Sequence, residues 1–120
     1  MVSKVSSYKE LIVWQKSMLL VKRIYELTRS FPEEERFGLT SQIRRSAVSV
    51  PSNIAEGWGR GSSKNFSQFL FIARGSLFEL ETQIYIAKEL DFLSDTKELE
   101  LLISEIGKIL NAIISRFKDK

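Results

Sequence analysis

The sequence contains no cysteine and no histidine. Without cysteine, the chain forms no disulfide and offers no thiolate to a metal. Without histidine, it lacks the commonest general base and the commonest metal ligand, and Ser-His-Asp and Cys-His catalysis are excluded. We therefore expect a protein that is not an enzyme and that uses no metal and no cofactor.

Proline, glycine and long apolar runs are also scarce. The 120 residues include two prolines and six glycines, and 43% of them are hydrophobic. This composition argues against disorder, and no stretch approaches the roughly 20 apolar residues that a membrane span needs. We expect one folded domain over residues 1–120, located in the cytoplasm and without a membrane partner.

Charge is distributed unevenly along the chain. The net charge is +3, but residues 1–74 contain twelve Lys and Arg against six Asp and Glu, whereas residues 75–120 contain six against nine. A basic half is typical of proteins that contact a polyanion, and a division of sign also suits head-to-tail assembly. An ordinary solvated surface explains the same distribution equally well.

Four segments show helical periodicity and are joined by short loops. We expect helices from Tyr8 or Leu11 to Arg29, from Phe37 or Leu39 to Glu56, from Ser63 to Leu90, and from a cap at Ser94 or Asp95 through Phe117. Short connections between long helices predict antiparallel neighbours, and hence an all-α, up-down-up-down four-helix bundle. Pro51 lies inside the second segment and predicts a kink there.

Apolar residues at steps of three and four predict the buried face of each helix. In the third segment this stripe is Phe66, Leu70, Ala73, Leu77, Leu80, Ile84 and Ala87. The second segment has Ile43, Ala47, Val50, Ile54 and Trp58. In the first segment the stripe is Leu11, Trp14, Met18, Val21, Tyr25 and Thr28, widened by Leu20, Ile24, Leu27 and Phe31. In the fourth it is Leu99, Leu102, Ile106, Ile109, Ile113 and Phe117, with Ile103, Leu110 and Ile114 beside it.

The second segment has a further, polar face of short or hydrogen-bonding residues, which let two helices approach closely. Its members are Gln42, Arg45, Ser46, Ser49, Asn53 and Glu56. We interpret Arg45, Asn53, Glu56, Arg74 and Glu79 as a structural polar cluster that fixes packing register. An enzyme built on these groups and Glu81 is the alternative, but the Glu-x-x-His pattern of di-iron bundles is impossible here.

A glycine-rich turn at residues 57–64 precedes the third segment, with Ser62 or Ser63 as its N-cap. The start of a helix can bind phosphate through free backbone N–H groups, although this spacing is not that of a P-loop. Arg44, Arg60 and Lys64 are the candidate nucleic-acid-binding residues, through contacts with phosphate.

A second aromatic stripe, Phe71, Phe78 and Tyr85, recurs every seven residues on the third segment. One four-helix core needs only one stripe per helix, so the second is a candidate oligomer interface. A wide core face is the alternative and has equal weight.

Longer motifs indicate a family. They are residues 13–16 (Val-Trp-Gln-Lys), 25–28, 31–32, 35–47, 49–57 (Ser-Val-Pro-Ser-Asn-Ile-Ala-Glu-Gly) and 73–81 (Ala-Arg-Gly-Ser-Leu-Phe-Glu-Leu-Glu). With these motifs the chain resembles the bacterial four-helix bundle family named after proteins encoded in intervening sequences of 23S rRNA genes. The resemblance implies a left-handed bundle with a kinked second helix, and a homo-oligomer, with a pentameric ring favoured.

That family is similar in turn to accessory proteins of diversity-generating retroelements, which form basic pentamers that bind a reverse transcriptase and nucleic acid. The Asn-Ile-Ala-Glu-Gly signature at residues 53–57 belongs to the rRNA-intervening group rather than to those accessory proteins. From the basic half and this resemblance we expect a non-catalytic oligomer that binds nucleic acid, RNA in the first place, through phosphate contacts. The alternative is a scaffold or accessory subunit that contacts a protein partner and no nucleic acid.

Overall fold

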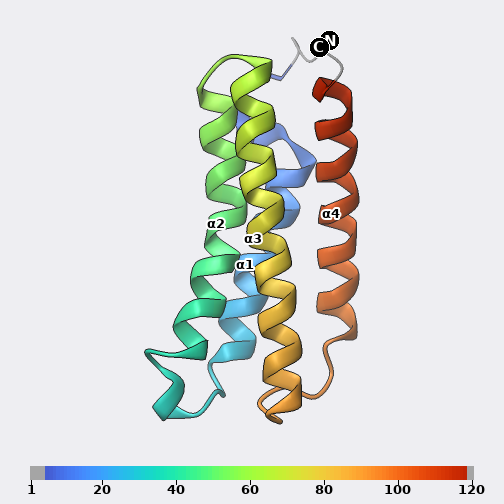
Figure 1. The fold of residues 1–120 in the computed structure, drawn as a ribbon. Coiled ribbons are helices and arrows are strands. Elements are labelled where there is room, and N and C mark those ends of the chain that lie inside the picture. The colour runs from blue at the N-terminus through green and yellow to red at the C-terminus, as the bar shows by residue number, and fades with distance from the viewer. Residues whose placement is uncertain (1–4, 119–120) are drawn as a thin grey trace.

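Four helices pack side by side in the computed structural model, which describes residues 5–118 (Figure 1). They are α1 (Ile12–Thr28), α2 (Leu39–Gly59), α3 (Ser63–Glu89) and α4 (Lys97–Lys118), with 3-10 turns η2 (Tyr8–Glu10) and η3 (Glu33–Glu35). The described residues include no strand, and the all-α four-helix prediction is confirmed. Residues 1–4 and 119–120 of the expected domain lie outside the described part.

Successive helices run in opposite directions along the long axis of the molecule, which measures 46 × 22 × 20 Å (Figure 1). Each helix lies beside the next in the chain, and α1 also lies beside α4, whereas the backbones of the diagonal pairs are farther apart. The start of α1, the turn between α2 and α3, and the end of α4 therefore lie at one end of the bundle. Within residues 5–118 no helix combines the length and the apolar character needed to cross a lipid bilayer.

Local capping explains where two of the helices begin. The Ser62 hydroxyl accepts a hydrogen bond from the Asn65 N–H at 3.2 Å, so Ser62 is the N-cap of α3, as the sequence predicts. Glu35 caps α2 from η3, because its carboxylate accepts from the Leu39 N–H at 3.0 Å. Of the three glutamates that form η3, Glu35 therefore has a structural role.

The buried core follows the predicted stripes of α2 and α3 most closely. Every predicted position of the α3 stripe is buried, as are those of α2 except Trp58, which is partly buried. Burying each leucine or isoleucine stabilises the fold by roughly 1.5–3 kcal/mol. Pro51 is buried inside α2, which continues on both sides of it, and the kink there stays a prediction.

In α1 and α4 the buried face includes the residues predicted beside the main stripe, while part of the main stripe is only partly buried or exposed. In α1 the core residues are Val13, Leu20 and Ile24, while Met18 and Tyr25 are exposed. In α4 they are Leu99, Ile103, Ile106, Leu110 and Ile114. The cause is the breadth of apolar residues on both helices, since such a face leaves several orientations open and packing against neighbours selects one.

Small residues bring α2 and α3 close together. A Cβ atom added to Gly57 would lie 2.6 Å from the Phe69 Cβ, nearer than side-chain atoms normally approach. Further along the same seam the Ser49 and Ser76 hydroxyls are 2.8 Å apart, and the Asn53 amide donates to the Ser49 carbonyl and hydroxyl. The seam is thus closed by small side chains that satisfy one another's hydrogen bonds.

Candidate nucleic-acid interface

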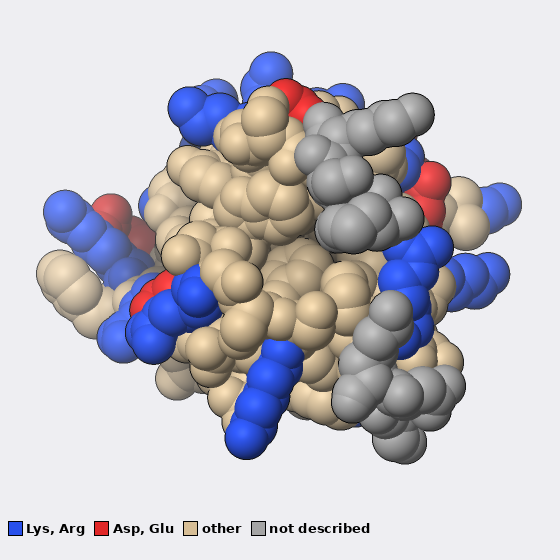
Figure 2. Space-filling model, turned by 90° about the horizontal axis from the view of Figure 1, so that it is seen from above, with Lys and Arg blue, Asp and Glu red and all other residues tan. Residues whose placement is uncertain are grey.

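Basic side chains gather at the end of the bundle where α3 begins. Arg60 follows α2, and Lys64 lies in the first turn of α3, with both side chains exposed. Between them Gly61 adopts a positive φ of 80°, which lets the chain turn tightly into the Ser62 cap. Figure 2 looks down on this end and shows Lys and Arg around a middle of uncharged residues.

Two basic residues that the sequence analysis did not select reach the same end. Arg116 lies near the end of α4 and borders a cavity together with Gly61 and Ser63. Lys9 belongs to η2, which packs against α2. The up-down-up-down topology could have indicated both, because it places the end of the fourth helix and the start of the first beside the α2–α3 turn.

Arg60 already has partners within the protein. Its guanidinium lies 2.9 Å from the Glu56 carboxylate and 4.9 Å from the centre of the Phe69 ring. Both ion-pair side chains are about half exposed, so this pair contributes little to stability and leaves guanidinium donors for a phosphate. Lys64 makes no ion pair with a described residue.

Arg44 does not join this group. Its Nε donates to the Thr28 hydroxyl at 2.8 Å, and its guanidinium stacks 4.6 Å from the centre of the Tyr25 ring. It is sixteen positions from Arg60 on one helix, which is about 24 Å along the axis. Of the three predicted phosphate contacts, the structure therefore brings together Arg60 and Lys64 and places Arg44 in the seam between α1 and α2.

The opposite end of the bundle is acidic. η3 consists of three glutamates, Glu33–Glu35, and the connection from α3 to α4 contributes Asp91 and Asp95. In Figure 1 both segments lie at the end away from the α2–α3 turn. Acidic side chains are thus frequent at this end, beside the cations Arg29 and Arg36, whereas the basic residues named above lie toward the end where α3 begins.

The five residues predicted as a structural polar cluster do not form one buried network. Arg45 and Glu79 are exposed, and Glu56 pairs with Arg60. Arg74 donates to the Asn111 side chain at 2.9 Å, and Asn53 bonds to its own helix. Charged groups keep their hydration on the outer faces, because burying a charge is unfavourable unless its pairing is excellent. The part-buried polar contact across the α2–α3 seam is made by two uncharged serines, Ser49 and Ser76.

The aromatic stripe on α3 is largely open to solvent in the single chain. Phe71, Phe78 and Tyr85 are 43%, 57% and 50% exposed. Arg74 stacks 4.9 Å from the centre of the Phe71 ring and Lys88 lies 5.8 Å from that of Tyr85. These side chains are outside the core of the chain, so the wide-core alternative does not account for them.

Glu100 is a carboxylate with a shifted pKa, and it lies away from the basic end. The pKa of Glu100 is lowered, first by a hydrogen bond from the Thr96 hydroxyl and then by the Lys88 ammonium at 3.3 Å. Both donors favour the ionised carboxylate.

Within residues 5–118 no three acidic side chains converge in a way that could hold a metal ion.

Comparison with known proteins agrees with this fold. The model of the family described as 23S rRNA-intervening sequence protein matches residues 9–112. Among solved structures, the chain is similar to a protein of unknown function from the S23 ribosomal protein family of Bacteroides thetaiotaomicron, with 27% identity and a TM-score of 0.76. That similarity covers 86% of this chain and 98% of the other. The comparison with curated proteins finds no match.

Proposed function

The chain belongs to the 23S rRNA-intervening sequence protein family, and from this premise we propose that it is a non-catalytic, oligomeric cytoplasmic protein that binds nucleic acid, RNA in the first place. The family membership confirms the resemblance found in the sequence motifs. The family's name links it to ribosomal RNA genes, which supports RNA as the first ligand to test.

The observation that carries this proposal is the meeting of Arg60 and Lys64 at the N-terminus of α3. Both side chains are exposed; Arg60 precedes the N-cap Ser62, and Lys64 belongs to the first turn of this 27-residue helix. Cations and a helix N-terminus together favour phosphate. None of these groups reads a base, so binding depends on charge and shows little sequence preference.

Oligomerisation would multiply a weak contact of this kind. One chain presents a small basic end, whereas a ring of copies presents several of them to one RNA at a high effective concentration. The exposed stripe of Phe71, Phe78 and Tyr85 supports self-association, because contiguous apolar side chains on a surface mark protein contacts.

The test is a titration of the purified protein with labelled single-stranded RNA, structured RNA and duplex DNA at low and near-physiological salt. We expect affinity to fall as salt rises. In an Arg60→Ala, Lys64→Ala double variant, the slope of log affinity against log salt should decrease by about 1 to 2. The probe that binds with the highest affinity would identify the class of nucleic acid that the protein prefers.

The matched control is an Arg29→Ala, Arg36→Ala double variant, which removes the same charge from the opposite end of the bundle. We expect it to bind as the wild type does. Equal weakening by both double variants would assign binding to net charge and contradict an interface at the α3 start. Absence of binding at low salt would reject nucleic acid altogether.

A protein-interaction scaffold is the second candidate function, and the same aromatic stripe favours it. In that case the α3 face holds a partner protein and the basic end is incidental. Two results together would support this alternative. In the titration, both double variants would weaken binding of the three nucleic acids equally, so that binding depends on net charge alone. In a capture experiment, Phe78→Asp would no longer retain the partner protein.

A further inference from the structure

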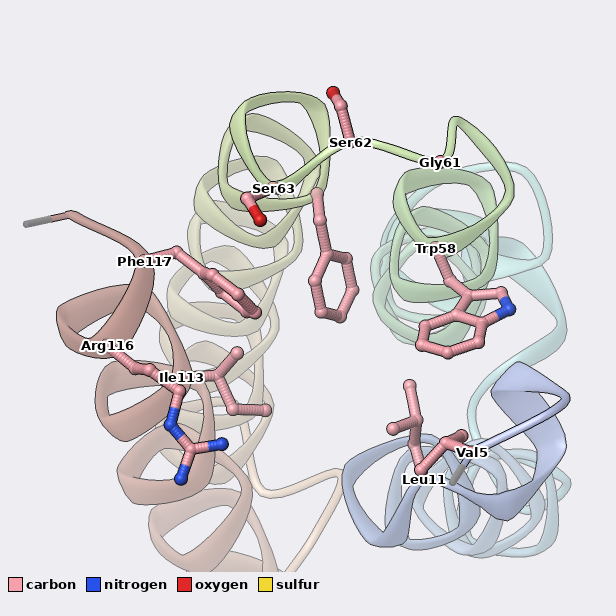
Figure 3. Close-up of a pocket in the computed structure, with 10 residues that line it drawn as sticks. Val5, Leu11, Trp58, Gly61, Ser62, Ser63, Ile113, Arg116 and Phe117 are labelled. Carbon is pink, nitrogen blue, oxygen red and sulfur yellow. The ribbon is translucent and has the colours of Figure 1, made fainter. Parts of the chain in front are cut away.

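A cavity opens at the basic end of the bundle, among the ends of all four helices. Its volume is about 480 Å³, within the range of roughly 300–1,000 Å³ typical of small-molecule sites. Figure 3 shows Leu11, Trp58, Ile113 and Phe117 directed toward this common space from α2, α4 and the start of α1.

The cavity wall is apolar and largely aromatic. Phe66 links the two sides of it, with its ring centre 6.2 Å from that of Trp58 and 5.6 Å from that of Phe117. Both pairs meet edge to face, which holds the rings in a fixed arrangement. A wall of this kind favours a hydrocarbon or aromatic group and gives no hydration to a charged one.

The polar groups of the cavity lie at its border. Arg116 extends from α4 and lines the cavity, with its guanidinium beside Ile113, while the Ser63 hydroxyl lies near the turn into α3 (Figure 3). Arg116 makes no ion pair with another described residue. An arginine fork binds one carboxylate through two parallel hydrogen bonds.

We propose that this cavity binds an amphipathic carboxylate, with its apolar body between Trp58 and Phe117 and its carboxylate on Arg116. One arginine at the border suits a single negative charge, and the surrounding basic end repels cations. Apolar burial provides the affinity and the arginine provides the preference for an acid over an alcohol or an amine. This site does not depend on the nucleic-acid proposal.

Trp58 reports on the cavity directly. In a Trp14→Phe background it is the chain's remaining tryptophan, so a change in emission on ligand addition comes from this wall. The probes are decanoate, decanol and decylamine, which share one alkyl chain and differ in the charge of the head group. We expect saturable binding of decanoate, weaker binding of decanol, and still weaker binding of decylamine.

Three variants in the same background locate the site. Arg116→Gln should weaken decanoate about tenfold and leave decanol unchanged, because only the acid uses the guanidinium. Ile113→Phe fills the apolar space and should weaken both ligands. Lys108→Gln removes an exposed charge elsewhere on α4 and should change neither.

Helical content measured by circular dichroism confirms that each variant is folded before it is titrated. The proposal is overturned if decanoate leaves Trp58 emission unchanged, or if folded Ile113→Phe binds both ligands as before, since the ligand would then lie elsewhere. It is also overturned if Arg116→Gln and Lys108→Gln weaken decanoate equally, because the preference would then reflect overall charge.

Discussion

Replacing Gly57 by alanine tests how closely α2 and α3 pack. The added Cβ would lie 2.6 Å from the Phe69 Cβ and 3.3 Å from the Phe66 carbonyl oxygen. Neither atom belongs to the free end of a flexible side chain, so the two helices must separate by several tenths of an ångström. That movement also stretches the 2.8 Å hydrogen bond between Ser49 and Ser76.

The expected loss follows from three terms. Overpacking a close interface costs about 1–3 kcal/mol, and weakening the serine hydrogen bond about 1 kcal/mol. Alanine offsets about 1 kcal/mol of this through its higher helix propensity. We expect the free energy of unfolding to fall by about 2 kcal/mol, which lowers Tm by about 8 °C in a 120-residue domain.

Gly75→Ala is the matched control, because a Cβ there meets nothing within 4 Å in the middle of α3. This variant should gain stability by about 1 kcal/mol from propensity alone. Thermal and urea unfolding are followed by circular dichroism at one fixed protein concentration, since self-association changes Tm. Equal stabilisation by both substitutions would show that α2 and α3 do not approach closely at Gly57, and would refute the reasoning.

Two further predictions concern the acidic end and the aromatic stripe. Because the folded-state pKa of Glu100 is lowered, its ionised form stabilises the fold above the ordinary glutamate pKa, and this stabilisation is lost as pH falls through the lowered value. Thr96→Val should raise the pKa of Glu100 in an NMR titration and weaken the acid dependence of unfolding; an unchanged Glu100 titration would show that the threonine contact has no effect. Phe78→Asp should dissociate the proposed oligomer in sedimentation velocity while the helical content stays intact, whereas Phe37→Asp, at a residue 88% exposed outside the stripe, should leave assembly unchanged. An intact Phe78→Asp oligomer would remove the stripe from the interface.

The number of helices, their approximate bounds and the buried face of α3 could be predicted from the sequence. The α3 stripe repeats regularly in steps of three and four, so one orientation buries all of its positions. Ser62 is a strong cap signal because a serine hydroxyl satisfies free N–H groups locally, with no help from the tertiary fold. The family could also be identified at this level, because its motifs are local runs of residues.

Only the tertiary structure decided how these helices face one another. On α1 and α4 the apolar residues spread too widely to select one orientation. Contact with neighbouring helices placed Val13 in the core rather than Met18 on α1, and Ile103 rather than Leu102 on α4. The grouping of the charges was decided in the same way. In the sequence, cations are in excess in the first half and anions in the second, whereas antiparallel packing groups basic residues from both halves at one end of the bundle, because that end brings together residues that are far apart along the chain. Arg116 therefore reaches the α2–α3 turn, while Arg44, with its Nε held by Thr28, lies about 24 Å along α2 from Arg60.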